Sequence, residues 1–226
     1  MITTLLVLKW VHILAMVYWL GGEWGVFQTS YNVINRKLPM EERKRHMETA
    51  YRIDILARTG IILLFPLGMH MGHIYGIQPW GGAFLIGMWV FFLAWLALCW
   101  AGFIYRETDR GIVITKADEA VRFVFIPLIV IASIASLLGY GPFEALPGQR
   151  WFSWKVLIFS FLLMLGLKLR FIMREWTELF RVLAMDPDNA QAEETLEKSI
   201  RVGRGIAYVY WIGIGTVAFL GAVKPF

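Results

Sequence analysis

Six long apolar segments run along the chain, and shorter polar segments separate them. Each apolar segment is close to the ~20 residues that an α-helix needs to cross the hydrocarbon core of a bilayer. The pattern predicts an all-α protein, a polytopic membrane helical bundle with six transmembrane helices in a single membrane domain covering residues 1–226. The predicted spans lie at about residues 4–27, 54–76, 83–105, 122–141, 151–173 and 205–223.

Two of the polar connections also carry helix signals. Residues 39–52 are expected to begin a helix that continues into the second span. Residues 186–189 predict a turn that caps a charged helix over residues 190–201, which leads into the sixth span. Neither segment is large enough to be a separate domain. His46, in the first of them, is expected to be a solvated surface histidine.

The composition agrees with a membrane protein. Of the 226 residues, 58% are hydrophobic and 17% are charged, which is too apolar for a soluble domain of this length. The only cysteine, Cys99, lies in an apolar span, so a disulfide framework and a cysteine metal cluster are excluded. The first residues lack a basic region followed by a small-residue cleavage site, so no cleavable signal peptide is expected.

The net charge of +5 reflects membrane topology, because Lys and Arg gather in alternate connections. The connections 32–52 and 106–122 and the one after the fifth span are basic, whereas 77–82 contains neither residue and 142–150 contains only Arg150. The positive-inside rule therefore predicts that both termini are extracytoplasmic. The expected setting is the lipid bilayer of a bacterial inner (cytoplasmic) membrane, crossed several times, and nucleic acid is not an expected partner.

Histidines in the first two spans are the main candidates for chemistry. His12 lies among apolar residues of the first span, and His70 and His73 lie three residues apart, on one side of the second. At 1.5 Å rise per residue, His12 is about 12 Å and His70 about 9 Å below the outer face. This match in depth predicts a haem b held by one imidazole from each of two adjacent helices, with His12 and His70 as the iron ligands. The alternative is that each histidine forms a structural hydrogen bond across the bundle.

Small and sulfur-containing residues surround His70 and His73 in the second span. Gly68 and Gly72 leave flat space that a porphyrin face or a neighbouring helix could use. Met69 and Met71 are expected to pack in the interior, although one of them could be an axial ligand if His70 is not.

Three cations lie near the predicted level of the histidines. Arg150 and Lys155 are at the start of the fifth span, and Lys9 is one turn before His12. They could pair with porphyrin carboxylates, or Lys155 could donate or accept a proton. The alternative for all three is a buried stem with its charge at the interface, which is the preferred interpretation for Lys9.

Glu23, at the other end of the first span, lies near the expected level of Asp54 and Arg58. A structural ion pair between Glu23 and Arg58 is predicted, since an unpaired charge there would be costly. A proton path to the cytoplasm is the functional alternative.

Four stretches of the chain resemble the HemJ-type protoporphyrinogen IX oxidases: LKWVHILAMVYWLGG, HMETAYRIDILARTGIILLFPLG, WFSWKVLIFSFLLMLG and the ending VAFLGAVKPF. The resemblance implies a haem b ligand at His12 and a functional lysine at Lys155. The family's arginine has a counterpart in Arg150, one residue out of spacing. His70 and His73 have no assigned counterpart. Members of the family have fewer spans, and the third and fourth, roughly residues 83–141, look inserted.

Three functions follow as hypotheses. The first is a membrane oxidoreductase of this type, whose haem b passes electrons from a porphyrinogen to quinone or another acceptor. The second is a cytochrome b subunit that passes electrons between a periplasmic cytochrome or dehydrogenase and quinone. The third is a copper permease, suggested by the segment 69–73, since first helices similar to this one also occur in the copper-resistance D family.

The third and fourth spans add a question about assembly. They contain Trp89, Trp95 and Trp100, which predict either an interface in a homo-oligomer or larger complex, or aromatic side chains that face lipid.

Overall fold

The computed structural model describes residues 3–106, 108–143 and 148–225 of the chain. These residues form six α-helices and no strand: α1 (Thr4–Val33), α2 (Met40–Ile74), α3 (Ala83–Ile104), α4 (Asp109–Leu137), α5 (Arg150–Met185) and α6 (Ala190–Val223). All six are long and apolar enough to cross a membrane. The predicted class, an all-α multi-pass membrane bundle, is therefore confirmed, and lipid is one of its partners.

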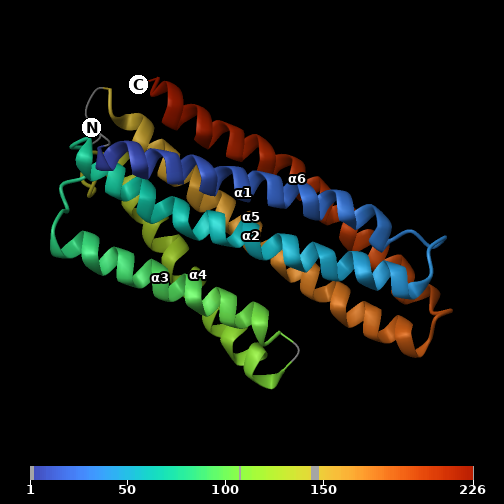
Figure 1. Ribbon diagram of the computed structural model, residues 1–226. Helices are drawn as coiled ribbons and strands as arrows, with labels where there is room; N and C mark the ends of the chain where they lie inside the picture. The colour runs from blue at the N-terminus through green and yellow to red at the C-terminus, as the bar shows by residue number, and fades with distance from the viewer. Residues whose placement is uncertain (1–2, 107, 144–147, 226) are drawn as a thin grey trace.

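Helices that are neighbours in the sequence are neighbours in space. Each helix packs on the next, α6 closes against α1, and α2 also touches α5. Figure 1 shows α1, α2, α5 and α6 as a long group and α3 and α4 as a shorter hairpin along one side. Both chain ends lie at one end of the bundle, here called the terminal end (Figure 1). The opposite end, which carries the connection with Arg36 and Lys37, is called the basic end.

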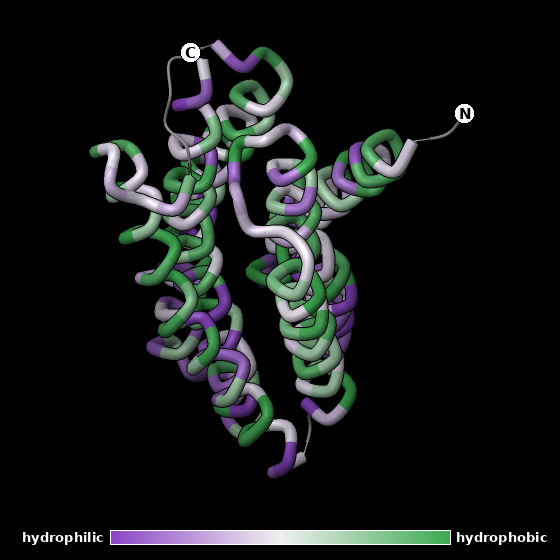
Figure 2. The backbone as a smooth tube through the Cα atoms, turned by 90° about the vertical axis from the view of Figure 1, so that its left-hand side faces the viewer, coloured by the Kyte–Doolittle hydropathy of each residue, from purple (hydrophilic) through white to green (hydrophobic). Residues whose placement is uncertain are grey.

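The outer surface is suited to hydrocarbon. Large apolar side chains such as Trp10, Ile86 and Ile131 are more than half exposed. Figure 2 shows hydrophobic residues over most of the length of the helices, with hydrophilic residues confined to shorter stretches. Apolar exposure on this scale is unfavourable in water and favourable against lipid.

Three helices extend beyond the apolar spans, and two of them, α4 and α6, begin at a capping side chain. The Asn189 side chain accepts a hydrogen bond from the backbone N–H of Ala192, at 3.0 Å, so α6 includes the predicted charged segment. Thr108 accepts from the N–H of Gly111 at 3.2 Å, and α4 therefore begins well before residue 122. α2 begins at Met40 and runs without a break to Ile74. The helices predicted from residues 39–52 and 190–201 are both confirmed.

A buried cation joins three of these extensions at the basic end. Arg43 donates to both carboxylate oxygens of Glu193, at 2.5 and 2.9 Å, and to the carbonyl oxygen of Val33, at 2.8 Å. The side chain of Arg43 is 4% exposed. It thereby links the end of α1 to the starts of α2 and α6 over a second apolar core, which includes Met47, Leu183, Leu196 and Ile200.

The tryptophans of α3 join α3 to α4 and hold the α3–α4 hairpin to α2. The indole N–H of Trp95 donates to Asp118 at 2.7 Å, that of Trp100 to Thr59 at 3.0 Å, and that of Trp89 to His70 at 3.2 Å. Trp95 is buried and the other two are half-buried. Their polar edges thus find partners inside the chain, and an assembly interface formed by these helices stays a prediction.

The tightest helix contact is that between α1 and α2. A Cβ atom added at Gly60 would collide with the carbonyl oxygen of Ala15 and lie 3.0 Å from the backbone nitrogen of Trp19. One added at Gly22 would lie 2.8 Å from the Cβ atom of Ala57. Small residues thus let the two backbones touch, as is common where helices pack within a membrane.

We expect Gly60→Ala to destabilise the bundle, because the new methyl group has no space between α1 and α2. Overpacking of this kind typically costs ~1–3 kcal/mol. The thermal midpoint of the purified protein in detergent measures the effect. Gly21→Ala is the matched control, since nothing lies within 4 Å of its added Cβ atom. Equal midpoints for the two variants would show that the helices are not in close contact.

Candidate functional site

A cavity of about 420 Å³ lies between α1, α2, α5 and α6 near the terminal end. Its size is within the ~300–1,000 Å³ of typical small-molecule sites. Apolar and aromatic residues make most of its wall, among them Met16, Trp19, Phe65, Trp151, Phe152 and Phe159. We call it the terminal cavity.

His12 lies on the wall of the terminal cavity and has no hydrogen-bond partner among the described residues. A Cβ atom at Gly68 would be 3.5 Å from the His12 Cε1 atom, so the imidazole of α1 packs over a glycine of α2. The Nδ1 atom of His12 is buried without a hydrogen-bond partner among the described residues. A structural histidine in a bundle is normally hydrogen-bonded. The unpartnered ring instead fits a ligand in the cavity, and an imidazole is a common axial ligand of haem iron.

The terminal cavity is cationic. Lys9, Lys155 and Lys224 are on its wall, and no Asp or Glu of the described residues lines it. No carboxylate in the described part of the chain pairs with Lys155, whose ammonium group occupies the space that a side chain at residue 221 would need. Lys224 lies over the ring of Tyr75, 4.0 Å from its centroid. This arrangement is suited to an amphiphilic molecule with carboxylates.

Lys224 was missed as a site residue by the sequence analysis. The only signal for it was its place in the C-terminal stretch that carries the resemblance. Its position on the cavity wall depends on the end of α6, where Lys224 adopts a left-handed backbone conformation with φ of 51°.

The structure does not bring His70, His73 and Arg150 to the terminal cavity. His70 Nδ1 accepts a hydrogen bond from the Trp89 indole. The Nδ1 atom of His73 lies 3.3 Å from the carbonyl oxygen of Gln78, in the connection to α3. Arg150 is exposed at the start of α5. Of the three predicted histidines and the pair Arg150 and Lys155, only His12 and Lys155 line this cavity.

The reason for the separation of His12 and His70 is the direction of their side chains. Gly68 is the residue of α2 that faces His12. Residue 70 follows two positions later, which is a rotation of about 200° around the helix. Its side chain therefore points away from α1 and toward α3, although its depth matches that of His12.

The residues that suggested copper do not converge. Met69 and Met71 line the terminal cavity, whereas His70 and His73 have partners elsewhere. Among the described residues, no three His, Cys, Asp or Glu side chains are grouped so as to hold a metal ion.

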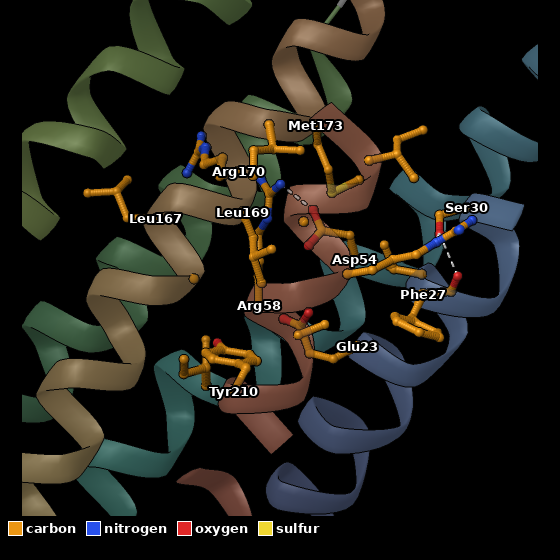
Figure 3. Close-up of a pocket in the computed structure, with 18 of the residues that line it drawn as sticks. Glu23, Phe27, Ser30, Asp54, Arg58, Leu167, Leu169, Arg170, Met173 and Tyr210 are labelled. Atoms are coloured by element: carbon orange, nitrogen blue, oxygen red, sulfur yellow. Dashed lines mark hydrogen bonds and ion pairs between the residues drawn. The ribbon is translucent and has the colours of Figure 1, made fainter. Parts of the chain in front are cut away.

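A second, smaller cavity of about 70 Å³ lies closer to the basic end, and we call it the polar cavity. Figure 3 shows Glu23, Asp54, Arg58 and Tyr210 pointing into it from α1, α2 and α6. Arg58 forms an ion pair with Asp54, one turn earlier on α2. The predicted Glu23–Arg58 ion pair is not formed.

Asp118 is the centre of a buried charge network beside the polar cavity. Its side chain is 1% exposed. It accepts hydrogen bonds from Trp95 of α3, from Arg122 of its own helix at 3.3 Å, and from Arg170 of α5. The neighbouring Glu119 accepts from Arg174 at 3.1 Å. Each buried charge thus has an opposite charge beside it. The network joins α3, α4 and α5, because its members come from all three helices.

Comparison of the chain with protein-family models, with curated proteins and with solved structures finds no match. The functional inference therefore depends on the geometry of the two cavities.

We expect Asp118→Asn to destabilise the bundle strongly. The change leaves the buried guanidinium groups of Arg122 and Arg170 without the charge that neutralises them, which typically costs about 3–5 kcal/mol. The free energy of unfolding in mixed detergent micelles measures it. Asp186→Asn is the control, because Asp186 is exposed and its side chain bonds only Asn189 among the described residues, at 3.1 Å. A stability equal to that of the control would mean that the network does not hold the helices together.

Proposed function

We propose that this protein binds haem b in the terminal cavity, with His12 as an axial ligand, and that it is a membrane oxidoreductase of the protoporphyrinogen oxidase type. The observation that supports this best is the unpartnered imidazole of His12 on the wall of a cavity of about 420 Å³. The proposal agrees with the resemblance of the first helix, of the Lys155 segment and of the C-terminal stretch to that family.

The residues around the cavity suit such a group. His12 would hold the iron, and bound haem would supply one-electron transfer. Met69 and Met71 are the residues of α2 with ligand-type side chains that line the cavity, so a second axial ligand from α2 would be a methionine sulfur. Glycines at residues 68, 72 and 221 let His12, Phe152 and Lys155 pack closely against the helix backbones on the cavity wall.

The lysines would bind the carboxylates of the cofactor or of an acidic, porphyrin-like substrate. Lys155 would orient a carboxylate within the cavity, since its ammonium group has no anionic partner in the described protein. Lys9 and Lys224 are exposed and lie at the mouth of the cavity. The aromatic rings of Trp151, Phe152 and Phe159 would exclude water from the reacting group. Quinone in the bilayer would be the electron acceptor.

A second candidate function is that of a cytochrome b subunit without a substrate of its own. The exposed Lys9 and Lys224 favour it, because a cationic opening at the terminal end suits docking of an acidic periplasmic cytochrome or dehydrogenase. The copper permease has no comparable support, since the side chains of residues 69–73 point in different directions.

The first test of haem binding is the optical spectrum of the purified protein, oxidised and reduced. We expect a Soret band and a b-type α band that are lost in His12→Ala, because the iron loses its ligand. They should be retained in His70→Ala and His73→Ala, whose side chains are outside the terminal cavity. Freshly purified protein without a Soret band would end the proposal. Loss of the band in His70→Ala but not in His12→Ala would show that the iron ligand lies on α2 and not on α1.

The test of the activity is rescue of a strain that lacks its own protoporphyrinogen oxidase. Lys155→Met is expected to reduce growth at least tenfold while the haem spectrum remains, because the substrate carboxylate loses its cation. Arg150→Met is the matched control, since Arg150 is exposed and does not line the cavity. A gene that yields haem-loaded protein but no rescue would contradict the oxidase and favour the cytochrome b subunit.

A further inference from the structure

The polar cavity has the size of a water site. At about 70 Å³ it is well below the ~300 Å³ of the smallest typical cofactor or substrate sites. Water takes up ~30 Å³ per molecule in the liquid, so the space suits a small number of waters. Its wall is rich in charged groups: Glu23, Asp54, Arg58, Arg122, Arg170 and Arg204, together with the hydroxyl groups of Ser30 and Tyr210.

Three polar groups on this wall have no partner in the described protein. The carboxylate of Glu23 accepts no hydrogen bond and forms no ion pair there. The indole N–H of Trp176, a residue only 4% exposed, is buried and unpartnered, and so is the Nη2 atom of Arg204. Buried polar groups in folded proteins are satisfied by protein or by water. Waters bound between these two donors and the Glu23 acceptor would satisfy all three.

The other charges around the cavity are neutralised by neighbours. Asp54 on α2 pairs with Arg58. On α4 and α5, Arg122 and Arg170 both pair with Asp118, which does not line the cavity. The remaining charges that face the cavity are Glu23 on α1 and Arg204 on α6. Glu23 is therefore the one carboxylate on this wall that can gain or lose a proton without breaking an ion pair of the described residues.

Arg204 connects the polar cavity with the surface near the basic end. Its guanidinium group lies 3.7 Å from the ring centroid of Tyr31, and its Nε atom donates to Ser30 at 3.1 Å. The side chain is half-buried, so one part faces the cavity and another reaches the surface. A path for protons and water from the surface to the cavity would begin at this point.

One face of α1 lines both cavities. His12, Met16 and Trp19 are on the wall of the terminal cavity, and Glu23 continues the same stripe into the polar cavity. The spacings of four, three and four residues follow the helical period of 3.6. Eleven residues separate His12 from Glu23, which is about 17 Å along the helix axis.

A hydrogen-bonded aromatic pair separates the two cavities. The indole N–H of Trp19, on the wall of the terminal cavity, donates to the hydroxyl of Tyr210 at 3.0 Å. Tyr210 is 1% exposed and lines the polar cavity. Because its oxygen accepts from Trp19, its own O–H can donate to water in the polar cavity. Waters in the polar cavity would extend this hydrogen bond to Glu23, which lines the same cavity as Tyr210 (Figure 3).

We infer that Glu23 is a proton-exchange site, loaded through the waters of the polar cavity, whose protonation compensates the charge of an electron in the terminal cavity. The coupling to an electron rests on the proposed function, whereas the exchange of a proton at Glu23 does not. When the donor gives one electron to the terminal cavity, the Glu23 carboxylate takes a proton from water in a fraction of the molecules and becomes a neutral acid there. When the acceptor removes the electron, the acid releases the proton. At the ~17 Å that separates His12 from Glu23 along the helix, and at an effective dielectric of ~20, an electron in the terminal cavity changes the proton affinity of Glu23 about fivefold.

The proton site is tested first without any redox step, by infrared difference spectra of the protein in lipid nanodiscs as the pH is changed. We expect a titrating carbonyl band of a buried carboxylic acid that is lost in Glu23→Gln. Glu23→Asp keeps a carboxylic acid at this position and should retain a band at a changed frequency. Its band would show that the loss in Glu23→Gln comes from removal of the acid and not from misfolding. Glu178→Gln is the matched control, because Glu178 is exposed on α5. A titrating band that persists in Glu23→Gln would overturn the inference.

The coupling is tested by the midpoint potential of the haem as a function of pH. We expect the potential to fall as pH rises in the wild type, and the slope to be at least halved in Glu23→Gln with an unchanged haem spectrum. An equal slope in both proteins would overturn the coupling. Protein without a Soret band would refute the proposed function instead, and the infrared result would still decide whether Glu23 exchanges a proton.

Discussion

The close contact between α1 and α2 is the constraint on which the rest of the structure depends. Glycines at residues 22, 60 and 68 remove the side chains that would keep the two backbones apart. The contact directs the His12 side of α1 into the bundle, over Gly68, where Nδ1 of the imidazole has no hydrogen-bond partner in the described part of the chain. The same rotation of α1 brings Trp19 to Tyr210 and Glu23 into the polar cavity.

Electrostatics divides the bundle interior into two parts. Near the terminal end, three lysines and no described carboxylate surround a large cavity, so this part attracts anions. Toward the basic end, buried ion pairs around Asp54 and Asp118 cancel most of the charge, and those of Asp118 join α3, α4 and α5. Because charges in a low-dielectric interior are costly without partners, the few that have none mark the places where a ligand or a proton is expected.

The fold could be predicted from hydropathy and capping residues, because long apolar segments in a bilayer have few alternatives to helices. His12 and Lys155 could be found because polar residues are rare within spans. The surroundings of His12 could not be found in this way. The depth of a side chain follows from the rise per residue, whereas its direction depends on which face of α2 touches α1. The network around Asp118 was missed for a related reason. Arg122 and Arg170 were interpreted as topological charges near the ends of spans, and their pairing depends on the packing of α4 on α5.

The central claim is that the unpartnered imidazole of His12 is a haem ligand in the terminal cavity. It is tested most directly by an anomalous difference map collected at the iron absorption edge from crystals of the protein purified from its native membrane. The account predicts a single iron peak in the terminal cavity, bonded to a ring nitrogen of His12. An iron peak at His70 or His73, or a map of well-ordered crystals without any iron peak in that cavity, would contradict it.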